Sequence, residues 1–236
     1  MRICFAGTAG HWQDVAFSLP HPDWTVSGIC PAWPGEDVGG LINALKTKGI
    51  TSPVFEGYTQ MLGAARPDAV VICGHNGQHG SMAIEAAARG IHILCEKPLC
   101  SSIAQLDVLE KTLAETNTKL MAMHTLRYDG VFAAARDFVI NGGVGVIRLM
   151  DARKSYKMGT RHWHYAKRET YGGTLAWVGI HAIDWLRWFS GAEFTSVFAR
   201  QSALHNNGNG EMETAAALCV PLVVEVSVGE SWDEAH

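Results

Sequence analysis

The chain has 236 residues, of which 47% are hydrophobic and 18% charged, with a formal net charge of −4. This length allows one large domain or two small ones, and the composition excludes an intrinsically disordered chain. The small net charge, without a basic block, gives no sign of a nucleic-acid partner. The apolar opening run is broken too early for a signal peptide, and no apolar stretch reaches the ~18 residues of a membrane span. We therefore expect a soluble, cytoplasmic protein without a membrane partner.

The first half of the chain alternates short apolar runs with helical patterns. The apolar runs cover residues 3–6, 24–30, 68–73, 92–95 and 120–123, and the helical patterns cover residues 41–48, 81–89 and 103–116. Short buried strands that alternate with helices predict a parallel sheet covered on both faces, in an α/β doubly wound (Rossmann) domain. Cys4, Cys30, Cys73 and Cys95 end such runs, which suits buried thiols better than disulfides or zinc ligands, and we expect no metal centre.

The second half has a different pattern, which predicts an α+β domain with an open mixed or antiparallel sheet. Helices are expected at 129–141 and 177–189, and strands at 146–156, 195–204, 212–220 and 222–229. We place the boundary near His124, which gives a nucleotide-binding domain over 1–123 and a substrate and oligomerisation domain over 124–236.

The segment Cys95-Glu96-Lys97-Pro98 stands where the fourth apolar run ends and the next helix is about to begin. Ligands of open α/β sheets bind outside the carboxyl ends of the strands. A lysine at this point is a candidate proton carrier, because burial lowers the pKa of its amine toward neutrality. Taken alone, the segment fits a surface Glu-Lys pair before a helix-starting proline better than it fits a proton carrier.

The first turn reads Gly7-Thr8-Ala9-Gly10-His11-Trp12, after a strand and before a helix, as a dinucleotide-binding turn requires. The match to G-x-G-x-x-G is poor, because Ala9 takes the second glycine position and Trp12 the third. A tight turn without a ligand explains the segment equally well. The second strand does not end on an acid for the ribose, and Glu36 and Asp37 follow only later, so the choice between NAD and NADP stays open.

The third apolar run ends at Gly74, and Asn76 is expected to cap the helix that follows. His75 and His79 stand four residues apart and can face together as metal ligands, although no third ligand is near in the sequence.

In the apolar helix near residue 180, Trp177, His181 and Asp184 share one face. A buried His-Asp pair is either an acid/base unit, with Asp184 orienting the imidazole, or a satisfied core pair. The loop Arg161-His162-Trp163-His164-Tyr165 suits a sugar-binding wall, and it suits an ordinary surface or subunit contact as well.

Together these segments resemble the Gfo/Idh/MocA family, the relatives of glucose–fructose oxidoreductase and inositol dehydrogenase, from residue 1 to about residue 230. The most specific parts are Asp68-Ala69-Val70-Val71-Ile72 with Asn76 and His79, then Gly90-Ile91-His92-Ile93-Leu94-Cys95-Glu96-Lys97-Pro98, then Arg127-Tyr128, and finally Gly172-Gly173 through His181-Ala182-Ile183-Asp184.

The resemblance implies hydride transfer between NAD or NADP and a secondary alcohol or ketone of a sugar, cyclitol or derivative. It implies that Lys97 polarises or deprotonates the substrate hydroxyl and that His181 is the partner acid/base. The implied cofactor site comprises Gly7, Ala9, Gly10, His11, Trp12, Gly74, Asn76, His79, Glu96 and Lys97, and the implied substrate site comprises Arg127, Lys154, Trp163, Trp177 and Asp184. A homo-oligomer, dimer or tetramer, is expected.

Three features depart from the family pattern: Ala9 and Trp12 in the turn, Trp177 where many members carry an aspartate, and a carboxyl-terminal part that is short for the family. They favour a competing hypothesis, a non-catalytic, degenerate nucleotide-binding or interaction protein. A third hypothesis is a metal-dependent enzyme that uses His75, His79 and another histidine.

Overall fold

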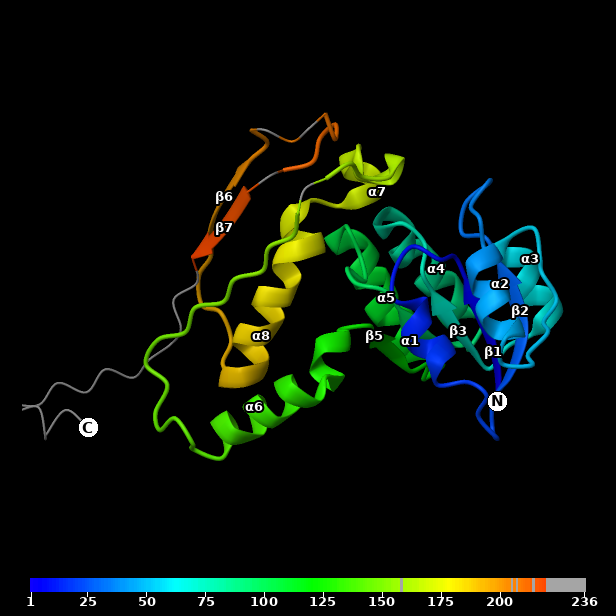
Figure 1. Ribbon diagram of the computed structural model, residues 1–236, viewed down its shortest axis with the longest axis horizontal. Helices are drawn as coiled ribbons and strands as arrows, with labels where there is room; N and C mark the ends of the chain where they lie inside the picture. The colour runs from blue at the N-terminus through cyan, green and yellow to red at the C-terminus, as the bar shows by residue number, and fades with distance from the viewer. Residues whose placement is uncertain (158, 205, 207, 214, 220–236) are drawn as a thin grey trace, which may run out of the picture.

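The computed structural model describes residues 1–157, 159–204, 206, 208–213 and 215–219, and consists of two regions (Figure 1). The first region carries a five-stranded sheet covered by helices. Its elements are β1 (Arg2–Ala6), α1 (Trp12–Phe17), β2 (Thr25–Cys30), α2 (Gly39–Lys46), α3 (Tyr58–Ala65), β3 (Ala69–Ile72), α4 (Asn76–Ala88), β4 (His92–Cys95), α5 (Ile103–Thr116) and β5 (Leu120–Ala122).

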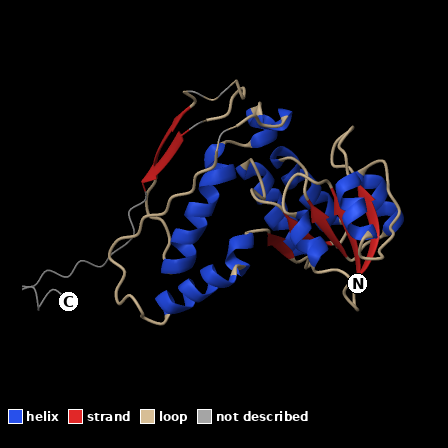
Figure 2. Ribbon diagram, in the orientation of Figure 1, coloured by secondary structure: helices blue, strands red, loops and turns tan. Residues whose placement is uncertain are grey.

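The strands of this sheet run parallel in the order β2-β1-β3-β4-β5. Alternate side chains of a strand face opposite sides of its sheet. Ile3 and Phe5 of β1 pack with α1 and α2 on one face, whereas Cys4 and Ala6 pack with α3, α4 and α5 on the other. The helices therefore form two layers around the sheet, as Figure 2 shows.

The order in which strands are added to the sheet reverses at β1, because β2 lies on one side of β1 and β3 on the other. Such a switch point leaves a crevice at the carboxyl ends of the two strands. The turns after Ala6 and after Ile72 face each other there, and the N–H of Ala9 donates to the Cys73 carbonyl at 2.8 Å. The sheet order thus brings the two glycine-containing turns together.

The second region contains helices and a two-stranded antiparallel sheet. Its elements are the 3-10 helix η1 (Thr125–Tyr128), α6 (Gly130–Ile140), the 3-10 helix η2 (Trp163–Tyr165), α7 (Arg168–Tyr171), the π-helix η3 (Leu175–Gly179), α8 (Ile180–Ser190), β6 (Phe198–Ser202) and β7 (Ala215–Cys219). The helix α6 packs beside α8, and α7 packs against α4 of the first region. This last contact joins the two regions close to the carboxyl edge of the sheet.

The predicted parallel α/β sheet, with a second α+β region after it, is confirmed. The strand predicted at 146–156 is wrong: the segment is irregular, with Val146 74% and Leu149 87% exposed. A strand needs a neighbour to satisfy its main-chain groups, and no described strand pairs with this segment. The strand predicted at 222–229 lies outside the described residues, and the domain boundary near His124 stays a prediction.

The helix expected from residue 81 begins earlier, at Asn76, so its cap position is His75 rather than Asn76. Helix α3 was not expected from the sequence at all. Cys4, Cys30, Cys73 and Cys95 are buried free thiols, as their positions predict.

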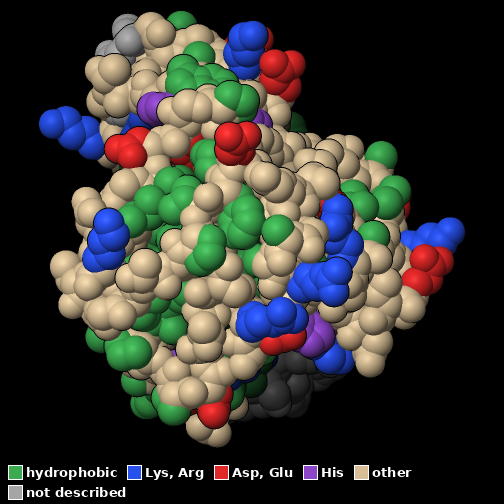
Figure 3. Space-filling view, turned by 90° about the vertical axis from the view of Figure 1, so that its right-hand side faces the viewer, with side chains coloured by type: hydrophobic (Ala, Val, Ile, Leu, Met, Phe, Trp, Pro, Cys, Tyr) green, Lys and Arg blue, Asp and Glu red, His purple; other side chains and the backbone are tan. Residues whose placement is uncertain are grey.

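Figure 3 shows the outer end of the first region, where Lys and Arg, Asp and Glu, and hydrophobic side chains are interspersed. This mixture is what a solvated protein surface typically carries, because apolar atoms make up much of any folded surface. Within the described part of the chain, no helix has the length and apolar character that crossing a bilayer demands.

Candidate active site

Lys97 lies two residues beyond the end of β4, at the carboxyl edge of the sheet. Its Nζ donates to the main-chain carbonyl of Trp177 at 2.9 Å, across the junction between the two regions. The residue is only 6% exposed. Burial lowers the pKa of the amine, Glu96 opposes the shift and Lys154 adds to it. The lowered pKa increases the fraction of the neutral amine, which is the form that accepts a proton.

Glu96 is buried beneath the first turn rather than open to the cleft. Its Oε1 accepts the His11 main-chain N–H at 2.6 Å and contacts His11 Nδ1, while its Oε2 accepts the Lys97 N–H at 2.9 Å. Burial by itself would raise the pKa of the carboxyl group, but the hydrogen bonds and charge of His11 outweigh it and lower the pKa. Gly10 is required here, because a Cβ on it would lie 2.5 Å from the Glu96 carboxylate.

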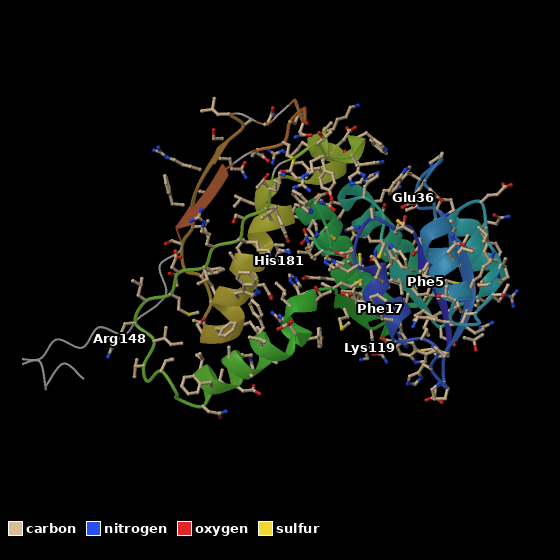
Figure 4. The ribbon with its side chains drawn as sticks, in the orientation of Figure 1. Phe5, Phe17, Glu36, Lys119, Arg148 and His181 are labelled. Atoms are coloured by element: carbon tan, nitrogen blue, oxygen red, sulfur yellow. The ribbon has the colours of Figure 1, made fainter. Side chains whose placement is uncertain are left out.

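His181 lies on α8, on the side of that helix toward the first region (Figure 4). Its Nε2 is buried and has no hydrogen-bond partner among the described residues. Burial, followed by the positive charges of Lys97 and Lys154, lowers the pKa of the imidazole to about 4. At neutral pH the ring is therefore uncharged, and a neutral imidazole nitrogen can donate or accept a hydrogen bond.

The predicted pairing of Asp184 with His181 is wrong. Asp184 instead accepts two hydrogen bonds from Arg127, from Nε to Oδ2 at 2.9 Å and from Nη2 to Oδ1 at 2.5 Å. Positions i and i+3 share a helix face, but here the Arg127 guanidinium engages both oxygens of the carboxylate. Arg127 and Asp184 are thus one bidentate pair at the edge of the site.

Trp177 contributes its carbonyl group to Lys97 and its ring to an aromatic cluster. The ring lies against Tyr156 and Tyr165, at centroid distances of 5.9 and 4.6 Å, and Arg161 lies 5.1 Å from it. Because residues 175–179 form a π-helix, the even 3.6-residue spacing assumed for one shared face is interrupted before His181.

Lys154 comes from the irregular segment that precedes these elements. Its Nζ lies 5.0 Å from the Tyr156 ring and 5.5 Å from the Trp185 ring. Its charge also lowers the pKa of both Lys97 and His181.

Asn76 and His79, predicted beside the nicotinamide, both support the surrounding main chain. Asn76 Nδ2 donates to the Tyr171 carbonyl at 2.7 Å. The His79 ring is fully buried between two carbonyls, with Nδ1 2.7 Å from that of Pro98 and Nε2 2.8 Å from that of Gly74. No ring nitrogen remains for a metal, and the described residues contain no group of three or more candidate ligands, which argues against the metal hypothesis.

The first turn has its main-chain donors engaged within the protein. The N–H groups of Gly7, Ala9 and Gly10 donate to carbonyls, that of Thr8 donates to Glu36 Oε1 at 2.7 Å, and that of His11 donates to Glu96. Glu36 also accepts from the Thr8 hydroxyl and, through Oε2, from the Ala32 N–H. Two carboxylates therefore occupy the positions where a Rossmann turn offers donors to an anion.

A cleft of about 630 Å³ opens beside this turn. It is lined by Thr8, Ala9, Trp33, Pro34, Gly35, Glu36, Asp37, His162, Trp163 and His164. Trp163, predicted in the substrate site, lies here instead, 6.1 Å from the Trp33 ring in an edge-on arrangement. Trp12 does not line the cleft and packs against the buried core under α1. Its bulk at the third glycine position is accommodated by the core.

The residues of this cleft fit the NAD(P) that the family resemblance implies. The volume lies within the range of nucleotide-sized pockets, and two tryptophan rings offer apolar faces to an adenine base. Thr8 already binds an anionic group, the Glu36 carboxylate, through both its N–H and its hydroxyl. Binding of a pyrophosphate at this turn requires that carboxylate to move aside.

Two supporting residues have no predicted role in the sequence. His124 was taken only as a boundary, although it follows β5 as Lys97 follows β4. Glu213 is buried and accepts hydrogen bonds from the Tyr171 hydroxyl and the Thr174 N–H, which anchors the Gly172-Gly173 turn. Strand register could have indicated His124, but Glu213 has no local sequence signal.

Comparison with known proteins gives two family models in tandem. Residues 12–124 match the oxidoreductase family with an NAD-binding Rossmann fold, and residues 132–232 match the GFO/IDH/MocA C-terminal domain.

A solved structure from Thermotoga maritima is 38% identical, with a TM-score of 0.91, over 95% of this chain and 69% of its own. An inositol 2-dehydrogenase from Rhizobium meliloti and a D-glucoside 3-dehydrogenase from Escherichia coli are each 30% identical, over 63% and 60% of this chain.

The chain spans less than half the length of these two curated relatives, 44% and 41% respectively. The two models, taken with the 38% identical structure, cover both regions of the fold and the segments that hold Lys97 and His181. The chain belongs to the Gfo/Idh/MocA family of oxidoreductases.

Proposed function

We propose that this protein is an NAD(P)-dependent oxidoreductase that interconverts a secondary alcohol and a ketone on a sugar, a cyclitol or a related polyol. The observation that carries the proposal is the buried amine of Lys97 at the carboxyl end of β4, within hydrogen-bond distance of the Trp177 carbonyl. A buried amine with a lowered pKa is suited to exchanging a proton with a hydroxyl group. The names of the curated relatives support the polyol substrate class.

In this proposal the protein positions the reactants and manages a proton. The nicotinamide, when bound, supplies the hydride chemistry. Lys97 takes the proton of the substrate hydroxyl as its neutral amine, or returns it in the reverse direction. His181, uncharged at neutral pH, offers its unpartnered Nε2 as a second hydrogen-bonding group for the same oxygen. Glu96 holds the Lys97 main chain against the turn that faces the cofactor cleft.

The adenosine half of the cofactor is assigned to the cleft between Trp33 and Trp163. Glu36 and Asp37 line this cleft together with Thr8. Two carboxylates close to a bound ribose repel an added 2′-phosphate, whereas they accept hydrogen bonds from its hydroxyl groups. We therefore expect NAD(H) to bind more tightly than NADP(H).

The substrate side is formed by Lys154, Trp177 and the Arg127–Asp184 pair. A bidentate Arg–carboxylate pair and an aromatic ring suit a ligand with several hydroxyl groups and an apolar ring face. A homo-oligomer and a cytoplasmic location remain part of the proposal, and light scattering on the purified chain tests the first of these.

A non-catalytic nucleotide-binding or interaction protein is the second candidate. The observation that favours it is the engagement of the N–H groups from Gly7 to His11, two of them by carboxylates. If those carboxylates do not move away, the N–H groups of this turn are not available to donate hydrogen bonds to a pyrophosphate. Trp177, which offers a carbonyl rather than a carboxylate to Lys97, points in the same direction.

Titration of the purified chain with NADH and with NADPH, followed by nicotinamide fluorescence, separates the two candidates. Micromolar binding of NADH, with weaker binding of NADPH, supports the enzyme and warrants turnover assays on a panel of polyols. Failure of a folded sample to bind either nucleotide contradicts the enzyme and leaves an interaction protein. The variant Trp33→Ala serves as an internal check, because it weakens binding at the proposed adenosine cleft without touching Lys97.

A further inference from the structure

His124 occupies a position equivalent to that of Lys97 on the neighbouring strand. Strands β4 and β5 run parallel with Cys95 paired to Ala122, so Lys97 and His124 each follow the paired residue by two positions. In a parallel pair, residues in equal register leave the same edge of the sheet. The His124 side chain is 18% exposed, and its Nδ1 is buried without a hydrogen-bond partner among the described residues.

Asp184 is the carboxylate nearest to that nitrogen, with 3.7 Å between His124 Nδ1 and Asp184 Oδ2. The carboxylate is 10% exposed and is held in place by the bidentate contact with Arg127. For a hydrogen bond to form, these two atoms have to move closer together by less than 1 Å. Catalytic hydrogen bonds in ligand-free proteins are commonly long and shorten when the ligand binds.

For the substrate proton to reach solvent, a group other than Lys97 has to accept it and release it. Lys97 is paired with a carbonyl, which can hold an ammonium group but cannot receive a proton from it. The pKa of His181 is lowered to about 4, so its charged form is disfavoured near neutral pH. Burial lowers the pKa of His124, and the charged and titratable groups that act on it are Asp184 and His181 on α8, Arg127 on η1, and Lys97 and Glu96 after β4. His124 is therefore a titratable ring that interacts electrostatically with both Lys97 and Arg127, and the Arg127 side chain is 38% exposed.

We propose that Asp184 and His124 form a second proton-transfer pair, in which Asp184 orients the ring and His124 relays the proton between Lys97 and solvent. The inference rests on the function proposed above. In the oxidation, the C–H bond of the alcohol gives a hydride to the oxidised nicotinamide, and the O–H bond gives a proton to Lys97. The ammonium group passes this proton to neutral His124, which releases it to water. The products are the ketone, the reduced nicotinamide and one proton, so atoms and charge balance.

His124 is thus a positioning and relay residue that acts through Lys97. A purely structural role predicts a loss of stability without a change in pH dependence. A relay role predicts that its ionisation contributes to the pH profile of turnover, and that Asp184 raises the pKa of the ring against the lowering effect of burial.

The first test is independent of turnover. The Cε1 proton resonance of His124 is followed by NMR as a function of pH in the wild type, in Asp184→Asn and in Glu193→Gln. Glu193 pairs with Arg187 beyond the other end of α8, so its replacement removes a carboxylate of the same kind at a distance from His124. We expect Asp184→Asn to lower the pKa of His124 by about one pH unit, and Glu193→Gln to leave it unchanged. An unchanged His124 titration in folded Asp184→Asn overturns the pair.

The second test is kinetic and uses His124→Gln, which keeps a polar side chain of similar size. We expect kcat to fall about 100-fold, the KM for the polyol to change by less than about twofold, and one ionisation to disappear from the pH profile. A profile identical to that of the wild type overturns the relay, even if Asp184→Asn fails to fold. Absence of turnover in the wild type, or full turnover in Lys97→Ala, contradicts the proposed function instead, and the NMR result still decides whether the pair exists.

Discussion

The carboxylate of Glu96 accepts the main-chain N–H of His11 at 2.6 Å, although the two residues lie 85 positions apart in the chain. The same oxygen contacts the His11 ring, and the second oxygen accepts the Lys97 N–H. One buried side chain therefore ties the first turn of the sheet to the segment that carries the proposed base.

The Glu96–His11 pair gives the protein a defined window of pH-dependent stability. Glu96 has a lowered pKa, so its contribution is complete above its usual value of 4.5 and is lost as pH falls through the lowered value. His11 has a pKa raised first by its hydrogen bond to Glu96, so its contribution is complete below 6.5 and is lost as pH rises through the raised value. We expect the pair to stabilise the fold most between pH 4.5 and 6.5.

Urea unfolding as a function of pH checks this expectation. His11→Ala is expected to reduce the stability by about 0.5–1 kcal/mol near pH 6, because the ring is partly exposed, and to flatten the curve above pH 6.5. The exposed His21 provides the control, and His21→Ala should leave the curve unchanged. Parallel curves for the wild type and His11→Ala would contradict the assignment.

Lys97→Ala is expected to lower kcat for polyol oxidation by about 10²- to 10⁴-fold, since it removes the proposed proton acceptor. Nucleotide binding should change little, because the Lys97 side chain bonds to Trp177 and not to the cleft beside Thr8. In the wild type, kcat/KM for oxidation should rise with pH through a pKa below the usual 10.5 of lysine. Steady-state assays with Lys119→Ala, an exposed lysine on the same domain, provide the control.

The sheet of the first region could be predicted from the sequence because its signals are local. Runs such as 68–73 and 92–95 are short, apolar and bounded by turn residues, and strands β3 and β4 coincide with them to within two residues. The prediction of a strand at 146–156 was wrong for the opposite reason. The residue pattern of a strand is local, whereas the pairing that stabilises it depends on a distant segment. A strand forms only where another chain segment satisfies its main-chain groups.

The residues of the candidate site could be proposed from the sequence, but their hydrogen-bond and packing partners could not. Lys97 and His181 could be chosen from motif positions, yet the partner of Asp184 could not, because a helix spacing of three does not specify which neighbour a carboxylate meets. The place of Trp163 beside Trp33 was not predictable for the same reason, as it depends on the approach of η2 to the end of β2. The occupation of the turn donors by Glu36 and Glu96 also depends on tertiary structure.

Glu36→Gln is expected to change the preference between the two nicotinamide cofactors. The change removes one negative charge beside Thr8 while keeping an oxygen that can accept from the Thr8 N–H. NADPH should gain affinity relative to NADH by about tenfold, because repulsion of the 2′-phosphate is reduced. Fluorescence titration of both nucleotides measures the ratio. The exposed Glu56 gives a matched control, and a ratio that shifts equally in Glu56→Gln would point to net charge rather than to the cleft.

Gly77→Ala is expected to disrupt the contact between the two regions. A Cβ at Gly77 would lie 2.1 Å from the Glu169 carbonyl and 3.2 Å from the Thr170 Cα, and both are main-chain atoms that cannot rotate aside. The neighbouring Asn76 bond to the Tyr171 carbonyl would be strained by the same displacement. We expect a loss of about 1–3 kcal/mol in the free energy of unfolding, together with reduced turnover.

Gly63→Ala is the matched control for this variant, since Gly63 lies within helix α3 and a Cβ there meets only an Arg89 side-chain atom at 4.0 Å. Alanine is favoured over glycine inside a helix by up to about 1 kcal/mol, so this variant should be neutral or stabilised. Thermal unfolding and turnover measured on both variants distinguish a steric effect at the α4–α7 contact from a general effect of adding a methyl group. If Gly77→Ala has the stability and the turnover of the wild type, the packing of α7 against α4 does not position the Gly172-Gly173 turn. The proposed structural role of Asn76 in the site is then contradicted as well.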